Sequence, residues 1–169
     1  NDSVRSSLMI TTDKCYDNKE WIWGYRENDA MGGHDPYSSS KGCAELVIQS
    51  YQKSYFNNNS ISALSSARAG NVIGGGDLSQ DRLIPDIVRA IENNSKVSIR
   101  NPLATRPWQH VFEPLNGYLL VAEDLFNSGH QKNSSWNFGP LITDIRSVDE
   151  VTDLFCKTWG GLNIIEYDK

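Results

Sequence analysis

The sequence of 169 residues has few cysteines, no long apolar run and no excess of positive charge. Its cysteines, Cys15, Cys43 and Cys156, stand far apart, which argues against a disulfide framework and favours a reducing setting such as the cytoplasm. No apolar run approaches the ~20 residues that a membrane-spanning helix needs. A nucleic-acid partner would require basic stripes, whereas the net charge is −5. We therefore expect a cytoplasmic protein with no nucleic-acid and no membrane partner.

Several well-known catalytic and metal-binding signatures are also missing. The three histidines are scattered, and no CxxC, HxxxH or HExxH spacing occurs, so no metal site is expected. The GxSxG turn of serine hydrolases is absent. The triple glycine at 74–76 lacks the Gly-Lys-Ser/Thr ending of a phosphate-binding loop, and no GxGxxG occurs. A turn with positive φ angles is the better interpretation of these glycines.

Strand and helix patterns alternate along the chain. Strands are predicted over residues 6–12, 60–67, 96–100, 135–138 and 163–167, and helices over 36–56, 82–94, 113–127 and 147–159. This alternation is typical of an α/β fold with parallel strands. The connection over residues 15–34 is long and rich in charge, glycine and aromatic residues. Such a loop is either functional or simply packed by its own tryptophans.

The helix predicted from residue 36 begins with a tyrosine and a lysine one turn apart. Asp35 is suited to cap this helix, and Pro36 to its first turn, where no backbone N–H is needed. Tyr37 and Lys41 are four residues apart and share one face. A free phenol has a pKa near ~10, and an adjacent ammonium group lowers it, so this pair is suited to accept a proton from a substrate hydroxyl. The alternative is a helix start that carries both residues by chance. Gly42, which costs ~1 kcal/mol in a helix relative to alanine, indicates that another segment packs close to this turn.

The first predicted strand ends in Thr11-Thr12-Asp13-Lys14. Ligands of parallel α/β sheets bind at the carboxyl ends of the strands. A helix entering beside this strand end would bring Tyr37 to the same place. The two segments together form a set for proton transfer, with a hydroxyl donor, an acid, a base and a charge partner.

These motifs resemble those of a known superfamily. The order Thr12…Tyr37-x-x-x-Lys41 resembles the Ser/Thr-Tyr-Lys signature of the short-chain dehydrogenases/reductases, in the extended branch that acts on nucleotide sugars. Thr12-Asp13 is similar to the Thr-Asp-Glu of the sugar-nucleotide 4,6-dehydratases, with Lys14 in place of the Glu. Further segments are similar to the subgroup that acts on CDP-glucose: residues 15–21, 68–77 and 106–111. The resemblance covers the chain from about Leu8 to Trp159, and the combined motifs are far more specific than any one of them.

The resemblance implies a partial Rossmann-like parallel sheet together with part of a smaller substrate-binding domain. Residues 1–77 would be the C-terminal half of an NAD-binding domain and would carry the catalytic residues. Residues 78–169 would be mostly a nucleotide-sugar-binding region, incomplete at its C-terminus. The chain has no Gly-rich turn for the NAD pyrophosphate. It therefore resembles the middle of a longer enzyme, and we expect the isolated segment to bind NAD poorly and to be inactive or to need a partner chain.

The implied activity is the NAD-dependent 4,6-dehydration of a nucleotide sugar, with CDP-D-glucose as the substrate, for deoxysugar polysaccharides. NAD⁺ would take a hydride from sugar C4 while Tyr37 removes the C4 hydroxyl proton, and the hydride would later return to C6. Thr12 would hydrogen-bond near the C4 oxygen, and Asp13 would protonate the departing C6 hydroxyl. Lys14 stands where most dehydratases have the Glu that takes the C5 proton. It is either desolvated enough to lose its own proton or acts only as a charge partner.

The resemblance also implies a set of ligand contacts. The residues expected to bind the cofactor are Thr11, Tyr37, Lys41 and Val72. Those expected to bind the substrate are Thr12, Asn71, Asp81, Arg82, Leu83, Ser98, Ile99, Arg100, Arg106 and Asn137. Arg106 is the best candidate for the pyrophosphate, because a planar guanidinium binds two oxygens at once.

Two other functions and one assembly remain open at this stage. An epimerase or simple reductase of the same fold would not need Asp13 as an acid toward C6. A non-catalytic interaction module would keep the fold without the chemistry. The helices beginning at residues 36 and 113 carry apolar stripes, which are either plain core or part of a four-helix contact in a homo-oligomer, a dimer or tetramer of the full-length enzyme.

Overall fold

The computed structural model describes residues 3–56, 60–129 and 133–167, and its chain forms two compact units. Unit 1 consists of Asn1–Gly70 and Val111–Gly139, and unit 2 of Asn71–His110 and Pro140–Lys169. This division differs from the single boundary after residue 77 that the sequence suggested. The chain leaves unit 1 after residue 70 and returns to it at residue 111, because the helix and strand that follow pack against the first two strands.

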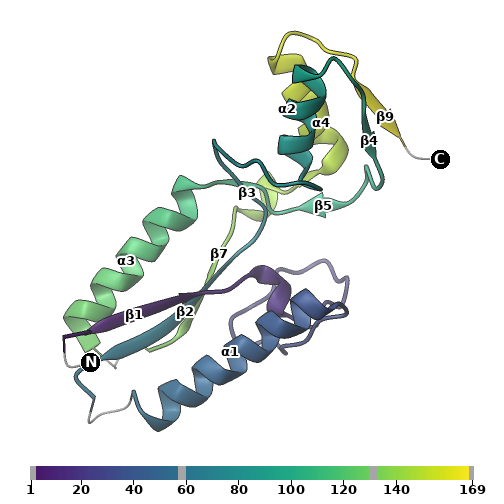
Figure 1. The fold of residues 1–169 in the computed structure, drawn as a ribbon. Coiled ribbons are helices and arrows are strands. Elements are labelled where there is room, and N and C mark those ends of the chain that lie inside the picture. The colour runs from purple at the N-terminus through teal and green to yellow at the C-terminus, as the bar shows by residue number, and fades with distance from the viewer. Residues whose placement is uncertain (1–2, 57–59, 130–132, 168–169) are drawn as a thin grey trace. The chain divides into compact units, whose positions relative to one another are not determined.

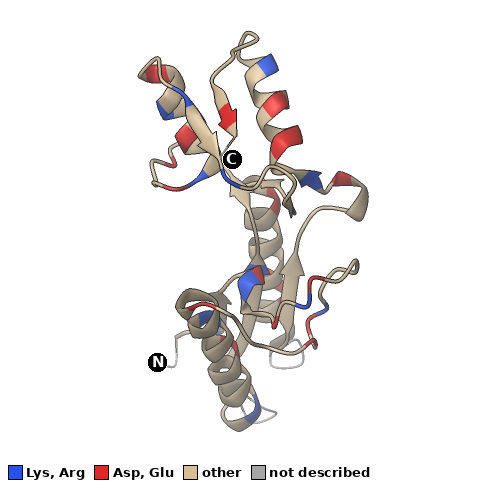
Figure 2. Ribbon diagram, turned by 90° about the vertical axis from the view of Figure 1, so that its right-hand side faces the viewer, with Lys and Arg blue, Asp and Glu red and all other residues tan. Residues whose placement is uncertain are grey.

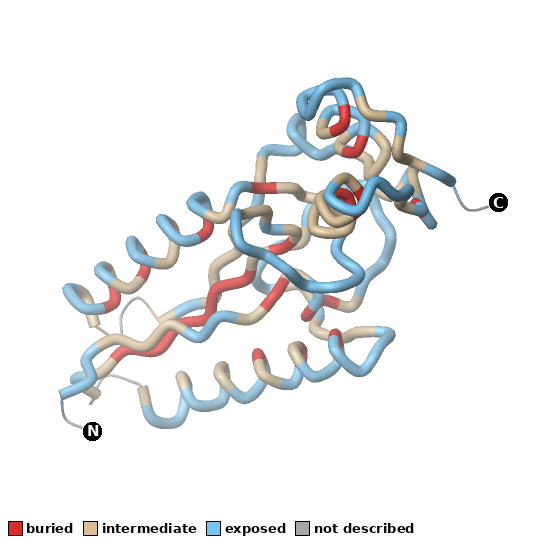
Figure 3. Tube along the Cα trace, turned by 45° about the horizontal axis from the view of Figure 1, so that its top comes forward, coloured by how far each residue is buried: buried red, intermediate tan, exposed pale blue. Residues whose placement is uncertain are grey.

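Unit 1 is built on a three-stranded parallel sheet. Its strands are β1 (Ser6–Ile10), β2 (Ala63–Ala69) and β7 (Ser135–Phe138), in the order β1-β2-β7. The register pairs Ser6 with Ala63 and Ser66 with Ser135. The central strand is buried along almost its whole length (Figure 3), although its sequence ALSSARA has small and polar residues where parallel strands usually carry branched apolar ones.

Two helices cover the sheet of unit 1 on opposite faces (Figure 1), α1 (Pro36–Ser54) and α3 (Phe112–Ser128). The buried core between sheet and α3 contains Ala63, Val121 and Leu125, with Leu8, Trp136 and Phe138 packed around it. The side chain of Asp35 caps α1 by accepting the Ser38 N–H at 3.0 Å. The predicted cap, start and type of this helix are therefore confirmed.

The long connection before α1 is ordered by its aromatic residues. A 3-10 turn, η1 (Asp13–Cys15), opens it, and an isolated bridge joins Tyr16 to Met31. The Tyr16 and Tyr25 rings stack with centroids 5.0 Å apart, and Trp21 lies 5.3 Å from Tyr25. This is the packing that one of the two sequence interpretations expected.

Unit 2 contains two helices and several very short strand pairs. The helices are α2 (Leu83–Glu92) and α4 (Val148–Thr158), and a 3-10 turn, η3, spans Ile142–Asp144. The parallel pairs are β3 (Val72–Ile73) with β6 (Gln109–His110) and β4 (Val97–Ile99) with β9 (Ile165–Tyr167), and the antiparallel pair is β5 (Thr105–Arg106) with β8 (Arg146–Ser147). The predicted helices and the strands near residues 97 and 165 are confirmed. The two-residue strands were missed, because so short a strand has no alternation to detect.

Three further features concern the distribution of charge, membrane-spanning helices and metal-binding clusters. Figure 2 shows basic and acidic residues interspersed along the ribbon of each unit. Within the part of the chain that the structure describes, no helix is long and apolar enough to cross a membrane. The same residues contain no cluster of three or more His, Cys, Asp or Glu side chains suited to hold a metal ion.

Candidate active site

The end of β1 carries a compact set of polar side chains. The Thr11 N–H still bonds to the Ala67 carbonyl at 2.9 Å, and the chain then turns into η1. Thr12 is buried, and its hydroxyl donates to Oδ1 of Asp13 at 3.0 Å and accepts the Lys14 N–H at 3.4 Å. The Lys14 ammonium lies 3.4 Å from the same carboxylate oxygen. Hydroxyl, carboxylate and ammonium are thus in direct contact at this strand end.

Gly70, at the end of β2, makes room for this carboxylate. A Cβ atom built on Gly70 would collide with the carboxylate of Asp13, so no larger residue fits without moving the acid. The sequence gave no sign of this contact beyond a glycine next to a strand end.

Tyr37 and Lys41 are neighbours at the start of α1. The Lys41 ammonium lies 5.8 Å from the centroid of the Tyr37 ring, which confirms that the two side chains share one face of the helix. The Tyr37 side chain is not packed into the interior, since the residue is 52% exposed. Among the described residues, the Lys41 ammonium has no hydrogen bond or ion pair. A phenol and an ammonium without a hydrogen bond or ion pair in the described part of the chain therefore lie side by side at an exposed helix start.

The start of α1 packs directly on η1. A Cβ atom on Gly42 would lie 2.9 Å from the Gly32 carbonyl oxygen and 3.2 Å from that of Cys15, so the glycine is required for this close approach. Hydrogen bonds from Ser38 hold the pKa of Asp35 below its usual value, and the nearby charge of Lys14 adds to the effect. The helix start and the strand end therefore meet in one place within unit 1.

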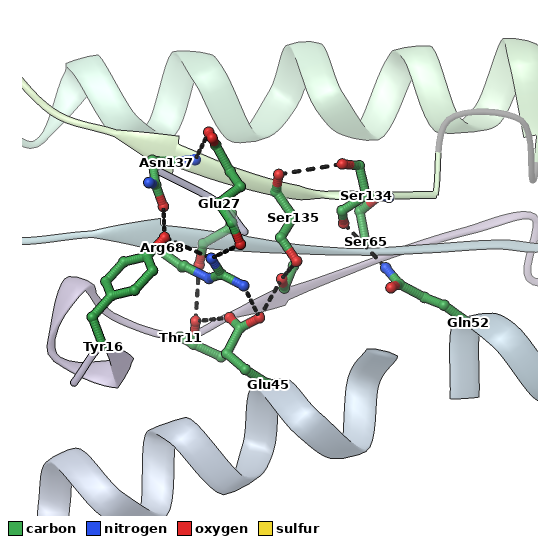
Figure 4. A network of polar contacts seen from close by, with 12 residues as sticks. Thr11, Tyr16, Glu27, Glu45, Gln52, Ser65, Arg68, Ser134, Ser135 and Asn137 are labelled. Atoms are coloured by element: carbon green, nitrogen blue, oxygen red, sulfur yellow. Dashed lines mark hydrogen bonds and ion pairs between the residues drawn. The ribbon is translucent and has the colours of Figure 1, made fainter. Parts of the chain in front are cut away.

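A buried ion pair lies beside this place, and the sequence reasoning gave it no role. Oε2 of Glu45 in α1 lies 2.6 Å from Nη2 of Arg68 in β2, and both side chains are fully buried (Figure 4). Burial raises the pKa of Glu45, but hydrogen bonds from Arg68, Thr11 and Ser66 outweigh this effect and bring the pKa below its ordinary value. The sequence signal that could have revealed this pair is Glu45, a polar residue at a position of an amphipathic helix that faces the sheet.

Two residues predicted to bind ligands are engaged inside the protein instead. The Thr11 hydroxyl, expected at the cofactor, donates to Glu45. The side-chain amide of Asn137, expected at the substrate, accepts from the Tyr16 hydroxyl at 2.7 Å and donates to the Tyr25 carbonyl at 2.9 Å. Asn137 therefore anchors the aromatic connection to β7, and its role in substrate binding stays a prediction.

The other predicted ligand residues lie in unit 2, most of them at its surface. Asn71 has a positive φ of 45°, and its buried Oδ1 has no hydrogen-bond partner among the described residues. The exposed residues are Val72, Asp81, Arg82, Ser98, Arg100 and Arg106. Leu83 is half-buried at the start of α2. Ile99 is only 4% exposed and its side chain packs inside unit 2, since alternate residues of a strand face opposite sides, so its contact with the substrate stays a prediction.

Comparison with known proteins identifies the family of the chain. Residues 2–139 match the NAD dependent epimerase/dehydratase family, and the chain belongs to this family. It is 54% identical over 162 residues to CDP-glucose 4,6-dehydratase from Salmonella typhimurium, a match that covers 94% of this chain and 45% of that protein. The chain therefore spans about half the length of the relatives it matches.

Solved structures show the same fold at much lower identity. dTDP-glucose 4,6-dehydratase from Bacillus anthracis in complex with NAD aligns with a TM-score of 0.75 at 22% identity, over 95% of this chain and 48% of that one. A variant of UDP-glucuronic acid 4-epimerase from Bacillus cereus, in complex with UDP-4-deoxy-4-fluoro-glucuronic acid and NAD, aligns with a TM-score of 0.79 at 15% identity. The alignment covers 97% of this chain and 48% of that one. Dehydratases and epimerases thus share this fold.

Proposed function

We propose that the protein catalyses the NAD-dependent 4,6-dehydration of a nucleotide sugar. The observation that carries the proposal is the contact of Thr12, Asp13 and Lys14 with one another at a strand end against which the helix bearing Tyr37 and Lys41 packs. An epimerase needs the base but has no use for an acid beside it. When bound, NAD⁺ would supply the hydride acceptor for C4 and, once reduced, the hydride donor for C6.

The side chains of unit 1 have separate tasks in this reaction. The Tyr37 side-chain oxygen takes the C4 hydroxyl proton as the C4 hydride leaves, and the Thr12 hydroxyl orients the C4 oxygen. The 4-ketone then acidifies the C5 proton. Asp13 gives a proton to the C6 hydroxyl, which departs as water while the C5 proton passes to a solvent water molecule. When the hydride later returns to C6, solvent returns a proton to C5. Lys41 holds the tyrosine and the nicotinamide ribose in place.

Lys14 is best assigned as the charge partner of Asp13. Its side chain is 47% exposed and lies 3.4 Å from the carboxylate, so the burial that would favour a neutral amine is absent. A solvated ammonium cannot accept the C5 proton. It is well placed to balance the charge left on Asp13 after the acid has given up its proton.

We assign recognition of the nucleotide to unit 2. Arg106 and Arg100 are exposed cations suited to the pyrophosphate, and the buried, unpartnered Oδ1 of Asn71 is suited to a sugar hydroxyl. CDP-glucose is the proposed substrate, on the name of the 54% identical relative and on Lys14 and the other segments that the sequence shares with that subgroup. In the cell, the enzyme would be cytoplasmic, would act in making deoxysugars for a polysaccharide, and would form a homo-oligomer through exposed apolar residues of α1 and α3.

The test is incubation of the protein, as its gene encodes it, with NAD⁺ and CDP-glucose, dTDP-glucose or UDP-glucose. We expect a 4-keto-6-deoxy sugar, detected by mass spectrometry as a loss of water, with CDP-glucose converted fastest. Asp13→Asn should still reduce bound NAD⁺ but fail to lose water. A 4-epimer as the only product, or no change with any sugar, would refute the proposal.

A further inference from the structure

The buried pair Glu45–Arg68 connects all the segments that form the proposed active site. The carboxylate of Glu45 accepts hydrogen bonds from two hydroxyls. One belongs to Thr11 at the end of β1, and the other to Ser66 in β2, at 2.8 Å. Nη1 of Arg68 donates to the Tyr16 hydroxyl at 2.6 Å and to the Glu27 carbonyl at 3.0 Å. One pair of charges thus joins a helix, two strands and the aromatic connection (Figure 4).

These links bracket the catalytic residues in sequence. Thr11 and Tyr16 flank the segment that contains Thr12, Asp13 and Lys14, so both sides of that segment are tied to the pair. Glu45 lies one helical turn beyond Lys41 on the same helix, and two turns beyond the tyrosine. Any displacement of the pair would therefore move the base relative to the acid.

Stability alone does not explain a buried pair of this kind. Removing two charges from water costs several kcal/mol per ion, and well-packed apolar replacements are often neutral or more stable. Nε of Arg68 also remains buried without a hydrogen-bond partner among the described residues, a further cost. The pair offers instead a fixed, directional geometry, which apolar side chains lack.

We propose that Glu45 and Arg68 are positioning residues that set the distance of Tyr37 and Lys41 from Thr12 and Asp13. The proposal rests on the function proposed above. Neither residue has to touch the sugar or the cofactor, and both act through the segments that they hold. Because a shift of about 1 Å in a reacting group can cost roughly 100-fold in rate, the pair should matter more for turnover than for folding.

The decisive variant replaces the pair as a whole, Glu45→Met with Arg68→Met. In the protein as its gene encodes it, we expect a free energy of unfolding close to that of the unaltered protein, because no lone charge is left buried. We expect kcat to fall by about 100-fold, with KM changed less than threefold. A double variant that folds and keeps the original kcat would overturn the proposal.

A second variant keeps the test decisive if the double variant does not fold. Tyr16→Phe removes one hydroxyl, which accepts from Arg68 and donates to Asn137, and so releases the segment after η1 from the pair. It should lower kcat about tenfold with little loss of stability. An unchanged kcat in a folded Tyr16→Phe protein would count against the proposal in the same way.

The matched control is Gln52→Leu. Gln52 also ties α1 to the sheet, through bonds to the carbonyls of Leu64 at 2.9 Å and Ser134 at 3.1 Å, but it lies near the far end of the helix. This change should lower stability and leave kcat unaltered. An equal loss of kcat in Gln52→Leu would mean that any loosening of α1 impairs turnover, and the special role of the pair would be refuted.

Amide hydrogen exchange separates this proposal from the proposed function. Without substrate or cofactor, residues 11–16 and 36–42 should exchange at least tenfold faster in the double variant, and at the original rate in Gln52→Leu. Unchanged exchange in the double variant refutes the positioning role, whatever the chemistry. If the unaltered protein converts no nucleotide sugar, the proposed function fails, and exchange still decides whether the pair holds these segments.

Discussion

Each of the two units is stabilised internally by a different kind of interaction. Unit 1 has a sheet with strands of four to seven residues in continuous register, and a fully buried ion pair beside its strand ends. Unit 2 relies on pairs of strands two or three residues long, and one of its ion pairs, Lys96–Glu166, is more than half exposed. The proposed proton-transfer residues lie in the first unit, and most of the proposed nucleotide contacts lie at the surface of the second.

This difference matches what each task requires. Proton transfer needs atoms held to within a fraction of an ångström, which a buried, hydrogen-bonded framework provides. Recognition of a flexible diphosphate relies on a few exposed cations, whose cost of ordering is small compared with that of a core. Unit 1 should therefore control kcat and stability, and unit 2 should control KM.

The largest expected effect is on kcat in unit 1. Tyr37→Phe removes the phenol proposed to accept the proton of the C4 hydroxyl, and kcat should fall by about 10²–10⁴-fold with little change in KM. Because the side chain is half exposed, the melting temperature should stay the same. Tyr51→Phe, at a similarly exposed position of α1, is the control and should keep full activity. A Tyr37→Phe protein with normal turnover would contradict the assignment of proton transfer to unit 1.

The second effect contrasts the two ion pairs. Arg68→Met leaves Glu45 buried without its partner, which should cost about 3–5 kcal/mol in the free energy of unfolding. Lys96→Met breaks a pair of exposed charges that lie 2.7 Å apart, and it should cost no more than about 1 kcal/mol. Urea denaturation of both variants measures the difference. Equal losses in the free energy of unfolding would mean that the buried and the exposed ion pair stabilise their units to the same extent.

The third effect is a pH dependence of unit 1. Burial raises the pKa of the Cys15 thiol from 9.0 to about 11. The folded state therefore favours the protonated thiol, so this stabilisation is complete below pH 9 and is lost as the pH rises toward 11. It amounts to roughly 2–3 kcal/mol.

Comparison of variants isolates this thiol from the other groups that titrate in the same range. The free energy of unfolding, measured from pH 8 to 11, should fall less steeply in Cys15→Ala than in the unaltered protein. Cys43→Ala removes an exposed thiol and should leave the slope unchanged. Identical slopes in all three proteins would show that Cys15 is not buried as described.

The smallest expected effect tests unit 2. Arg106→Ala should raise KM for the nucleotide sugar about tenfold, the equivalent of one charge-assisted hydrogen bond, and should leave kcat unaltered. Lys157→Ala removes a cation that is exposed on α4 and should leave both constants unchanged. Steady-state kinetics with CDP-glucose gives both values. A fall in kcat without a rise in KM would mean that Arg106 acts in the chemical step. It would contradict the assignment of kcat to unit 1 and of KM to unit 2.

Much of the architecture was predictable from local patterns. The helix at 36–54 was located by its cap, its proline and its apolar stripe, and the strand at 135–138 was placed with its observed bounds. The contact between Tyr37 and Lys41 followed from helical spacing alone. The two-residue strands of unit 2 and the return of residues 111–139 to unit 1 were not predictable, because both depend on pairing between distant segments.

The sequence by itself determined which residues are proposed for the chemistry, because a motif of fixed spacing on one helix and one strand end is a local property. Only the tertiary structure decided how those residues are held. The Glu45–Arg68 pair joins positions 23 residues apart, and Asn137 bonds to Tyr16 across 121 residues. Such contacts exist only when the sheet has formed, so the internal hydrogen bonds of Asn137 and Thr11 could not be predicted from local patterns.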